Sequence, residues 1–303
     1  MPTLKEIKGR IASVRNTLKI TSAMKLVSSA KLRKAQKAIE NMRPYEEQLQ
    51  GILSSLGGAA GTKSADFVRE GDEKGLTGTK PRVFVAIASN SSLCGGFNAA
   101  AVAKVRELRR EGDVVYSVGR KMAEAMRRDG FPSPEDLNDL AEHPAFARVA
   151  DLVEALSKQW EAGRFAQVLL VYNHFVSTAR QEPVVEVLVA SDPSAQEPQD
   201  DRASVPSAHS VILSDSEESP DTIVEPSREA LLQLLLPKTR KLKLYAALLD
   251  SSAAEHAART VAMQTATDNG ENLLQELTLQ YNKGRQQKIT SEILDLAGGQ
   301  AAE

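Results

Sequence analysis

The chain has a single cysteine, Cys94, in a turn-rich segment next to Gly95 and Gly96. A cysteine thiolate can act as a nucleophile, and a glycine turn that leads into a helix can bind an anion such as a phosphate. Neither of the spacings that hold nucleotide phosphates, G-x-G-x-x-G and G-x-x-x-x-G-K-[ST], occurs in the sequence. The residues therefore favour a structural tight turn with an ordinary buried or half-buried thiol over a nucleotide site or a catalytic cysteine.

The histidines and carboxylates also lack a spacing that suits catalysis or metal binding. The four histidines stand far apart: His143, His174, His209 and His256. Protein metal sites draw on closely spaced ligands, whereas His256 lies on an alanine-rich stretch that suggests packing or an interhelical hydrogen bond. Adjacent carboxylates, as at Glu46–Glu47 and Asp200–Asp201, do not converge on a substrate. The sequence predicts no catalytic, cofactor-binding or metal-binding residue.

A long helix is expected at the N-terminus. Apolar residues at spacings of three and four form a coiled-coil seam there: Leu4, Ile7, Ile11, Val14 and Leu18. The helix is predicted to begin near Thr3, with Glu6 at the capping-box offset, and to end near Leu56 before two glycines. Pro44 inside it predicts a kink, because proline removes one backbone hydrogen bond and crowds the preceding turn.

The seam changes character after Leu18. Its next three positions are polar: Thr21, Lys25 and Ser28. The apolar side chains shift instead to a displaced stripe: Ile20, Ala23, Met24, Val27 and Ala30. A phase shift of this kind predicts a local change in the supercoil.

A second long helix is expected from Arg228 to about Ala297, with an irregularity at Pro237. It carries an alanine stripe at intervals of four: Ala254, Ala258, Ala262 and Ala266. Asn269–Gly270 is typical of a turn, but helical periodicity resumes at once, so the helix is predicted to continue. Because neither terminal helix can bury its stripe alone, the simplest arrangement is an antiparallel two-helix coiled coil.

The middle of the chain predicts an α/β domain. Four buried-strand patterns are present: Arg82–Ala88, Asp113–Val118, Gln167–Tyr172 and Val184–Ala190. Helical patterns alternate with them at Ala99–Glu111, Arg120–Arg128 and Ala150–Glu161, which indicates a partly parallel sheet. No helix pattern separates the last two strands, which are therefore expected to be antiparallel. The predicted division is 1–58 helix, 59–81 linker, 82–190 α/β domain, 191–227 acidic linker and 228–303 helix.

Charge is distributed unevenly along the chain. Residues 1–43 carry eleven basic and two acidic side chains, a local charge of +9, although the net charge of the whole chain is −2. Such a helix presents either a solvated face or a surface for an acidic protein, nucleic acid or membrane. With one cysteine and no signal-peptide pattern we expect a reducing compartment, and no apolar run reaches the roughly 18–20 residues of a membrane span.

Three stretches together point to a family. They are LKEIKGRIASVRNTLKITSAMKLVSSAKLRKAQ (Leu4–Gln36), SLCGGFN (Ser92–Asn98) and EHAARTVAMQTATDNGENLLQELTLQYNKGRQQKITSEILDLAGG (Glu255–Gly299). They resemble the gamma subunit of the rotary F-type ATP synthase, of the bacterial type. Asn90 and Ser91 stand where that family has an acidic and then a basic residue.

The resemblance implies a fold and a role. The fold is α/β with long terminal helices: an antiparallel two-helix coiled coil plus a central Rossmann-like α/β domain. The role is that of a central rotor shaft that stands inside a ring of three alpha and three beta subunits, on the membrane c-ring and beside the epsilon subunit. It implies no catalysis by this chain, no cofactor, no direct small-molecule substrate and no nucleic acid, and a peripheral location on the cytoplasmic face of the bacterial inner membrane.

Candidate contact residues follow from this resemblance. Acidic loops of the beta subunits are hypothesised to face four basic side chains: Lys25, Lys31, Arg33 and Lys34. Three more residues match family positions that hydrogen-bond a beta-subunit loop: Arg259, Gln286 and Thr290. A hydrophobic sleeve is expected around the apolar end, as a bearing: Ile289, Ile293, Leu294 and Leu296. Solvated helix positions, or packing within the coil, explain the same residues.

Two other functions fit parts of the sequence. A basic coiled coil could bind nucleic acid or act as a scaffold, although aromatic residues are not interleaved with the basic ones. A small α/β enzyme with helical arms is the other alternative, and nucleotide turnover by the purified chain alone would support it.

Overall fold

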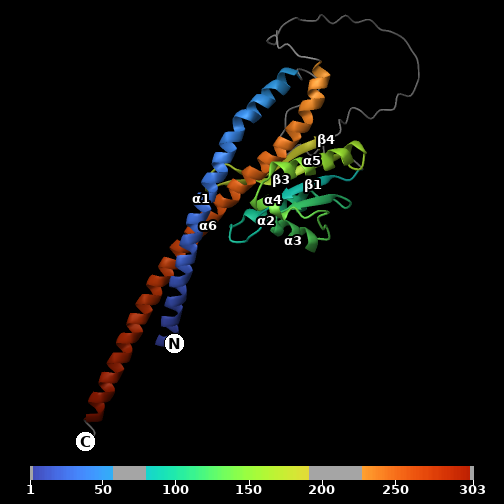
Figure 1. The fold of residues 1–303 in the computed structure, drawn as a ribbon. Coiled ribbons are helices and arrows are strands. Elements are labelled where there is room, and N and C mark those ends of the chain that lie inside the picture. The colour runs from blue at the N-terminus through green and yellow to red at the C-terminus, as the bar shows by residue number, and fades with distance from the viewer. Residues whose placement is uncertain (1–2, 57–79, 191–226, 301–303) are drawn as a thin grey trace, which may run out of the picture.

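The computed structural model describes residues 3–56, 80–190 and 227–300. The linkers predicted at 59–81 and 191–227 fall almost wholly outside the described residues. The elements are α1 (Leu4–Leu56), β1 (Val83–Ile87), α2 (Phe97–Leu108), β2 (Val114–Val118), α3 (Arg120–Arg128), α4 (Asn138–Glu142), α5 (Phe146–Glu161), β3 (Gln167–Phe175), β4 (Gln181–Ala190) and α6 (Arg228–Gln300). Figure 1 shows α1 and α6 crossing side by side, with the α/β domain on one side of them.

The sheet has four strands in the order β2-β1-β3-β4. Strand β1 is parallel to β2 and β3, because helices cross over between them, and β3 is antiparallel to β4. The short turn between β3 and β4 is closed by two backbone hydrogen bonds between Ser177 and Arg180, at 3.0 and 3.2 Å. The predicted fold class and the antiparallel pairing of the last two strands are both confirmed.

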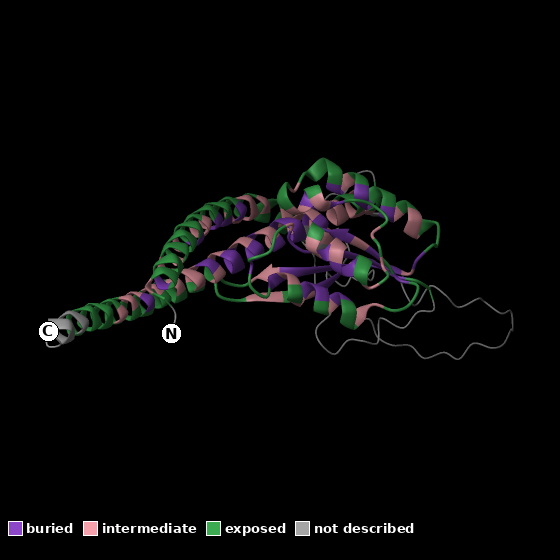
Figure 2. Ribbon diagram, turned by 90° about the horizontal axis from the view of Figure 1, so that it is seen from below, coloured by how far each residue is buried: buried purple, intermediate pink, exposed green. Residues whose placement is uncertain are grey.

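Both faces of the sheet are covered, so β1 is buried along its whole length. Val83, Val85 and Ile87 belong to a core that includes residues of α5 and α6. Phe84 and Ala86 point to the opposite face, where α2 and α3 pack. One of the helices that cover the first face is therefore α6 itself, and Figure 2 shows buried residues of the long helix beside the sheet.

The pairing of α1 with α6 is antiparallel and keeps one register. A Cβ added at Gly270 would lie 2.7 Å from Leu18 Cδ2, and one added at Gly284 would lie 3.2 Å from Leu4 Cδ2. From Leu4 to Leu18 the chain advances fourteen residues along α1, while the facing glycine moves back fourteen residues along α6, from Gly284 to Gly270. Helix α6 continues through Asn269–Gly270 as predicted, and Gly270 makes room for the Leu18 side chain.

The predicted shift of the seam is wrong. Thr21 and Ser28 are buried, at 9% and 3% exposure, whereas Ile20 and Val27 of the displaced stripe are 60% and 57% exposed. The hydroxyl of Thr267 on α6 donates to Thr21 Oγ1 at 3.0 Å, and Thr21 Oγ1 donates to the Leu18 carbonyl at 3.1 Å. Because the Thr21 hydroxyl is hydrogen-bonded, burying it costs little free energy. The seam therefore continues in its original phase, with the small polar residues Thr21 and Ser28 at its buried positions.

The helix ends agree with the sequence. Thr3 and Glu6 form the predicted capping box, in which each side chain accepts a hydrogen bond from the other's backbone N–H, at 3.3 and 3.0 Å. Pro44 and Pro237 lie inside their helices and do not end them.

Candidate partner-binding surfaces of the shaft

The four basic residues expected to face acidic loops of the beta subunits do not share one side of α1. At about 100° per residue, Lys25, Lys31, Arg33 and Lys34 lie at about 0°, 240°, 80° and 180° around the helix axis. Lys25 is half-buried, whereas Arg33 and Lys34 are exposed. The Lys31 ammonium lies 3.7 Å from the Glu142 carboxylate on α4. The contact of these residues with acidic loops of the beta subunits stays a prediction.

An exposed apolar face on α1 was not recognised from the sequence. Ile20, Leu26 and Val27 are 60%, 70% and 57% exposed, on the part of α1 that precedes its contact with the domain. Exposed apolar groups that gather on one surface mark contact sites for other proteins. From the sequence pattern, Ile20 and Val27 were assigned to the paired side of the helix, and Leu26 was not assigned to either side.

Arg259 is engaged within the chain. Its guanidinium donates to Glu255 Oε1 at 2.6 Å and to Ser91 Oγ at 2.9 Å, and its side chain is 9% exposed. Burial raises the pKa of the Glu255 carboxyl, while the adjacent Arg259 lowers it. The predicted contact of Arg259 with a beta-subunit loop stays a prediction, since the hydrogen bonds seen here join α6 to the loop after β1.

His256 lies next to this pair on α6, half-buried, with a buried Nδ1 that has no hydrogen-bond partner. Burial lowers the pKa of His256 to about 4, with Arg259 and Lys31 acting in the same direction. The ring is therefore neutral at pH 7, which suits the packing role inferred from the sequence.

This histidine gives a pH prediction. A group with a depressed basic pKa contributes stability above its unfolded pKa, near 6.5, and loses it as the pH falls toward 4. Lowering the pH from 7.5 to 4.5 should therefore reduce the free energy of unfolding less in the His256→Gln variant than in the parent. The difference between the two losses should be about 1–2 kcal/mol once solvent screening is allowed for. Urea unfolding at both pH values measures the difference, and equal losses in the two proteins would contradict it.

The C-terminal end of α6 extends beyond α1 (Figure 1). Gly284 already faces Leu4, the first residue of α1, so the following turns have no helix beside them in the described chain. Three of the predicted bearing residues are exposed there: Ile289 at 47%, Ile293 at 58% and Leu294 at 65%. The side chain of the fourth, Leu296, lies outside the described part.

Gln286 and Thr290, the other predicted contacts on α6, occupy this same single-helix end and are exposed. They are one turn apart, and the Thr290 hydroxyl donates to the Gln286 carbonyl at 2.9 Å. The structure thus brings these two residues together but places them far along α6 from Arg259.

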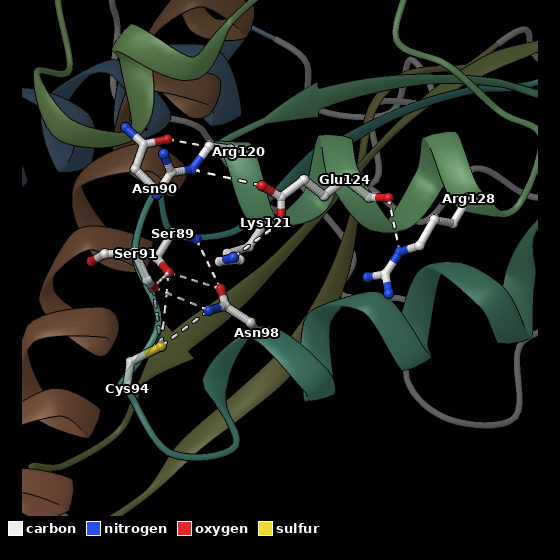
Figure 3. A network of polar contacts seen from close by, with 9 residues as sticks. All are labelled: Ser89, Asn90, Ser91, Cys94, Asn98, Arg120, Lys121, Glu124 and Arg128. Carbon is white, nitrogen blue, oxygen red and sulfur yellow. Dashed lines mark hydrogen bonds and ion pairs between the residues drawn. The ribbon is translucent and has the colours of Figure 1, made fainter.

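The glycine turn is held by its own side chains (Figure 3). Asn98 Oδ1 accepts from the backbone N–H of Ser89 at 3.0 Å, and Asn98 Nδ2 donates to Cys94 Sγ at 3.1 Å. Asn90 Oδ1 accepts from the Arg120 N–H at the start of α3, at 2.9 Å. The Cys94 thiol is buried, which agrees with the interpretation as an ordinary buried thiol.

The turn also packs against the shaft. Ligands of sheets of this kind bind outside the carboxyl ends of the strands, where the strand order reverses, which is between β1 and β3 here. In this chain Cys94 and Phe97 form a buried cluster there with Ala254 and Ala258 of α6. The glycine turn therefore contacts a helix of its own chain.

Comparison with known proteins decides the family. A family model described as ATP synthase matches residues 3–302. The ATP synthase gamma chain of Phocaeicola vulgatus is 43% identical over 309 residues that cover 100% of both chains. This chain belongs to the ATP synthase gamma-chain family. Gamma chains of Bacteroides fragilis and Heliobacterium modesticaldum, which are 42% and 37% identical over at least 99% of each chain, agree.

Solved structures show the same fold at lower identity. The chain is similar to one in the Euglena gracilis mitochondrial ATP synthase, with a TM-score of 0.68 and 20% identity over 99% of this chain and 94% of that one. A chain from the Tetrahymena thermophila central stalk and c-ring gives a TM-score of 0.52 and 24% identity over 82% of this chain and 99% of that one. The gamma-chain family gives no support to the nucleic-acid-binding alternative. Among the described residues no helix is long and apolar enough to cross a membrane.

Proposed function

We propose that this gamma-family chain is the central rotor shaft of an ATP synthase and carries no catalytic group itself. The observation that supports this most is the shape: two unequal helices in one fixed antiparallel register, one of which continues alone past the other. The partners proposed by family membership are three alpha and three beta subunits, the epsilon subunit and the membrane c-ring. The proposed location is peripheral, on the cytoplasmic face of the bacterial inner membrane.

The mechanism is differential binding. One asymmetric shaft cannot contact three identical catalytic sites in the same way, so at any angle it favours a different conformation in each. It can shift an equilibrium only by its difference in affinity for the two conformations, and about 1.4 kcal/mol corresponds to a tenfold change in nucleotide affinity. Turning the shaft would then drive product release. Because binding couplings are reciprocal, ATP hydrolysis would turn the shaft backwards.

Two surfaces fit this role. The exposed apolar face formed by Ile20, Leu26 and Val27 lies on the two-helix part of the shaft. The single-helix end presents Ile289, Ile293 and Leu294. We propose that the first contacts the alpha/beta ring and the second turns in a hydrophobic sleeve as a bearing. The first surface lies on α1 and the second near the end of α6, so they occupy different levels along the length of the shaft.

Co-expression tests the proposal directly. The chain should co-purify with three alpha and three beta subunits and should raise the ATP hydrolysis rate of the alpha/beta assembly. The purified chain alone should not turn over nucleotide, and turnover by the chain alone would favour the enzyme alternative. Failure to enter the assembly would contradict the rotor function.

Reversing exposed charges on α1 should weaken the coupling between rotation of the shaft and ATP synthesis. Arg33→Glu with Lys34→Glu is expected to lower the rate of ATP synthesis about tenfold, if each lost contact is worth about 0.5–1 kcal/mol. The matched control is Arg127→Glu with Arg164→Glu, two exposed basic residues of the α/β domain. Synthesis in inverted membrane vesicles is the measurement, and equal rates in parent and α1 variant would remove these residues from the contact.

A further inference from the structure

Three polar side chains of α6, at three positions along the helix, form hydrogen bonds with the α/β domain. The first is Lys243, whose ammonium donates to the Val187 carbonyl on β4 at 2.8 Å. The same ammonium lies 3.3 Å from Glu186 Oε2, and the two side chains are 16% and 11% exposed. Tyr172 donates to the other oxygen of Glu186 at 2.6 Å, which fixes the carboxylate on the sheet.

The second is Asp250, which holds the end of β3. Its Oδ1 accepts from the Phe175 N–H at 3.1 Å, and its Oδ2 lies 2.5 Å from His174 Nδ1. The Asp250 side chain is 18% exposed. One carboxylate therefore binds both a backbone and a side-chain group of the sheet.

The third is Arg259, which donates to Ser91 Oγ in the loop after β1 at 2.9 Å. Glu255, one turn earlier on α6, holds the guanidinium in this direction at 2.6 Å. The loop is in turn fixed to the domain, because the neighbouring Asn90 donates to the Asn138 carbonyl at 2.8 Å and accepts from the Arg120 N–H at 2.9 Å.

Between these three points α6 buries both leucines and alanines: Leu244 and Leu248 belong to the core of the domain, and a run of alanines follows. The buried alanines of this stretch are Ala247, Ala253, Ala254, Ala257 and Ala258. Apolar burial is not directional. Hydrogen bonds depend strongly on direction, so the three polar contacts add a fixed direction to the apolar packing of the domain on α6.

We propose that Lys243, Asp250 and Arg259 are positioning residues that lock the α/β domain at one angle on the two-helix shaft. They bind β4, β3 and the loop after β1, so three separate parts of the domain are tied to α6. At about 1.5 Å per residue the three are separated by about 10 and 14 Å along α6, which gives the lock a long lever against twisting. Being charge-assisted and at least partly buried, the bonds are strong and costly to leave unmade.

The inference rests on the geometry of this chain alone. Its consequence under the proposed rotor function is that torque applied to the domain would pass to the coiled coil without slip. If the domain could rotate on α6, part of its rotation would not be transmitted to the coiled coil.

Distance measurement by double electron–electron resonance on the isolated full chain tests the lock. Spin labels are placed at Arg127→Cys on α3 and Gln275→Cys on α6, both exposed positions. The native Cys94 is buried and is left in place. The test variant is Asp250→Ala with Arg259→Ala, and the matched control is Asp268→Ala with Arg285→Ala, exposed residues of the same two types on the same helix.

The parent and the control should give one narrow distance distribution. The test variant should give a distribution roughly twice as wide or a second distance, because the locked angle is no longer the only populated state. A variant with parent-like helical circular dichroism and an unchanged distribution would overturn the proposal. Should the double variant fail to fold, Asp250→Asn and Arg259→Lys are measured singly, and no broadening in either would also overturn it. None of these results depends on whether the chain rotates.

Discussion

The substitution Ala257→Leu is expected to force the two helices of the shaft apart. Ala257 is fully buried, at 0% exposure, in a cluster with Leu32, Ala35 and Ala253, against which Phe175 packs. Overpacking a tight core costs typically about 1–3 kcal/mol. Since the site is also where β3 meets the shaft, both the coil and its junction with the domain should loosen. Thermal unfolding followed by helical circular dichroism should show a lower midpoint, and ATP synthesis in the assembled enzyme should fall.

The control for this change is Ala30→Leu. Ala30 is an exposed residue of α1, so its leucine variant adds the same atoms to a helix without entering the seam. It should unfold within a few degrees of the parent. An Ala257→Leu variant as stable as Ala30→Leu would show that the seam is looser than the buried alanines indicate.

Removing the Asp113 carboxylate is expected to lower the free energy of unfolding of the α/β domain by about 3–5 kcal/mol. Asp113 accepts from Arg82 Nη2 at 2.7 Å and from the Arg82 N–H at 2.9 Å, and the two side chains are 3% and 4% exposed. The N–H of Arg110 donates to the same carboxylate at 2.8 Å. Asp113→Ala would leave a buried guanidinium without its counter-charge.

Urea unfolding followed by the fluorescence of Trp160 measures this effect. Trp160 is the single tryptophan of the chain and packs against the core of the domain, and the Arg240 guanidinium of α6 lies 5.3 Å from the centre of its ring, so it reports on the domain and its junction with α6. Asp139→Ala is the control, because Asp139 and its partner Arg148 are 58% and 46% exposed and 3.7 Å apart. Such a surface pair is worth about 1 kcal/mol or less. Equal losses in the two variants would contradict the account of the buried pair.

Local patterns were enough to predict the elements of the sheet. Each predicted strand overlaps an observed one, because strands buried on both faces are continuous apolar runs. The absence of a helical pattern before the last strand was also enough to predict that β3 and β4 are antiparallel. The single-turn helix α4, Asn138–Glu142, was missed, since five residues carry no periodicity.

The seam shows where pattern reading fails. Hydrophobicity favoured the stripe through Ile20 and Val27, yet the paired surface contains Thr21 and Ser28. What decides the register is the partner helix: the Thr267 hydroxyl on α6 donates to Thr21 Oγ1 at 3.0 Å, a contact that isoleucine could not make. A choice of this kind depends on both helices at once and cannot be derived from the spacing in one of them.

The position of Arg259 could not be predicted for a related reason. Its neighbours in space are Glu255, one turn away, and Ser91, which is 168 residues away in the sequence. Resemblance suggested an external contact, whereas in the structure the side chain joins the shaft to the loop after β1. Long-range polar contacts of this kind leave no periodic signal in a sequence.

The central claim is that this asymmetric pair of helices turns inside the alpha/beta ring. Its most direct test attaches a visible probe to Arg127→Cys, an exposed position of the domain, in an assembly of this chain with alpha and beta subunits fixed to a surface. On addition of ATP the probe should rotate in one direction and pause at three angles in each turn, one for each catalytic pair. A probe that stays fixed, or moves at random while the assembly hydrolyses ATP, would contradict the claim.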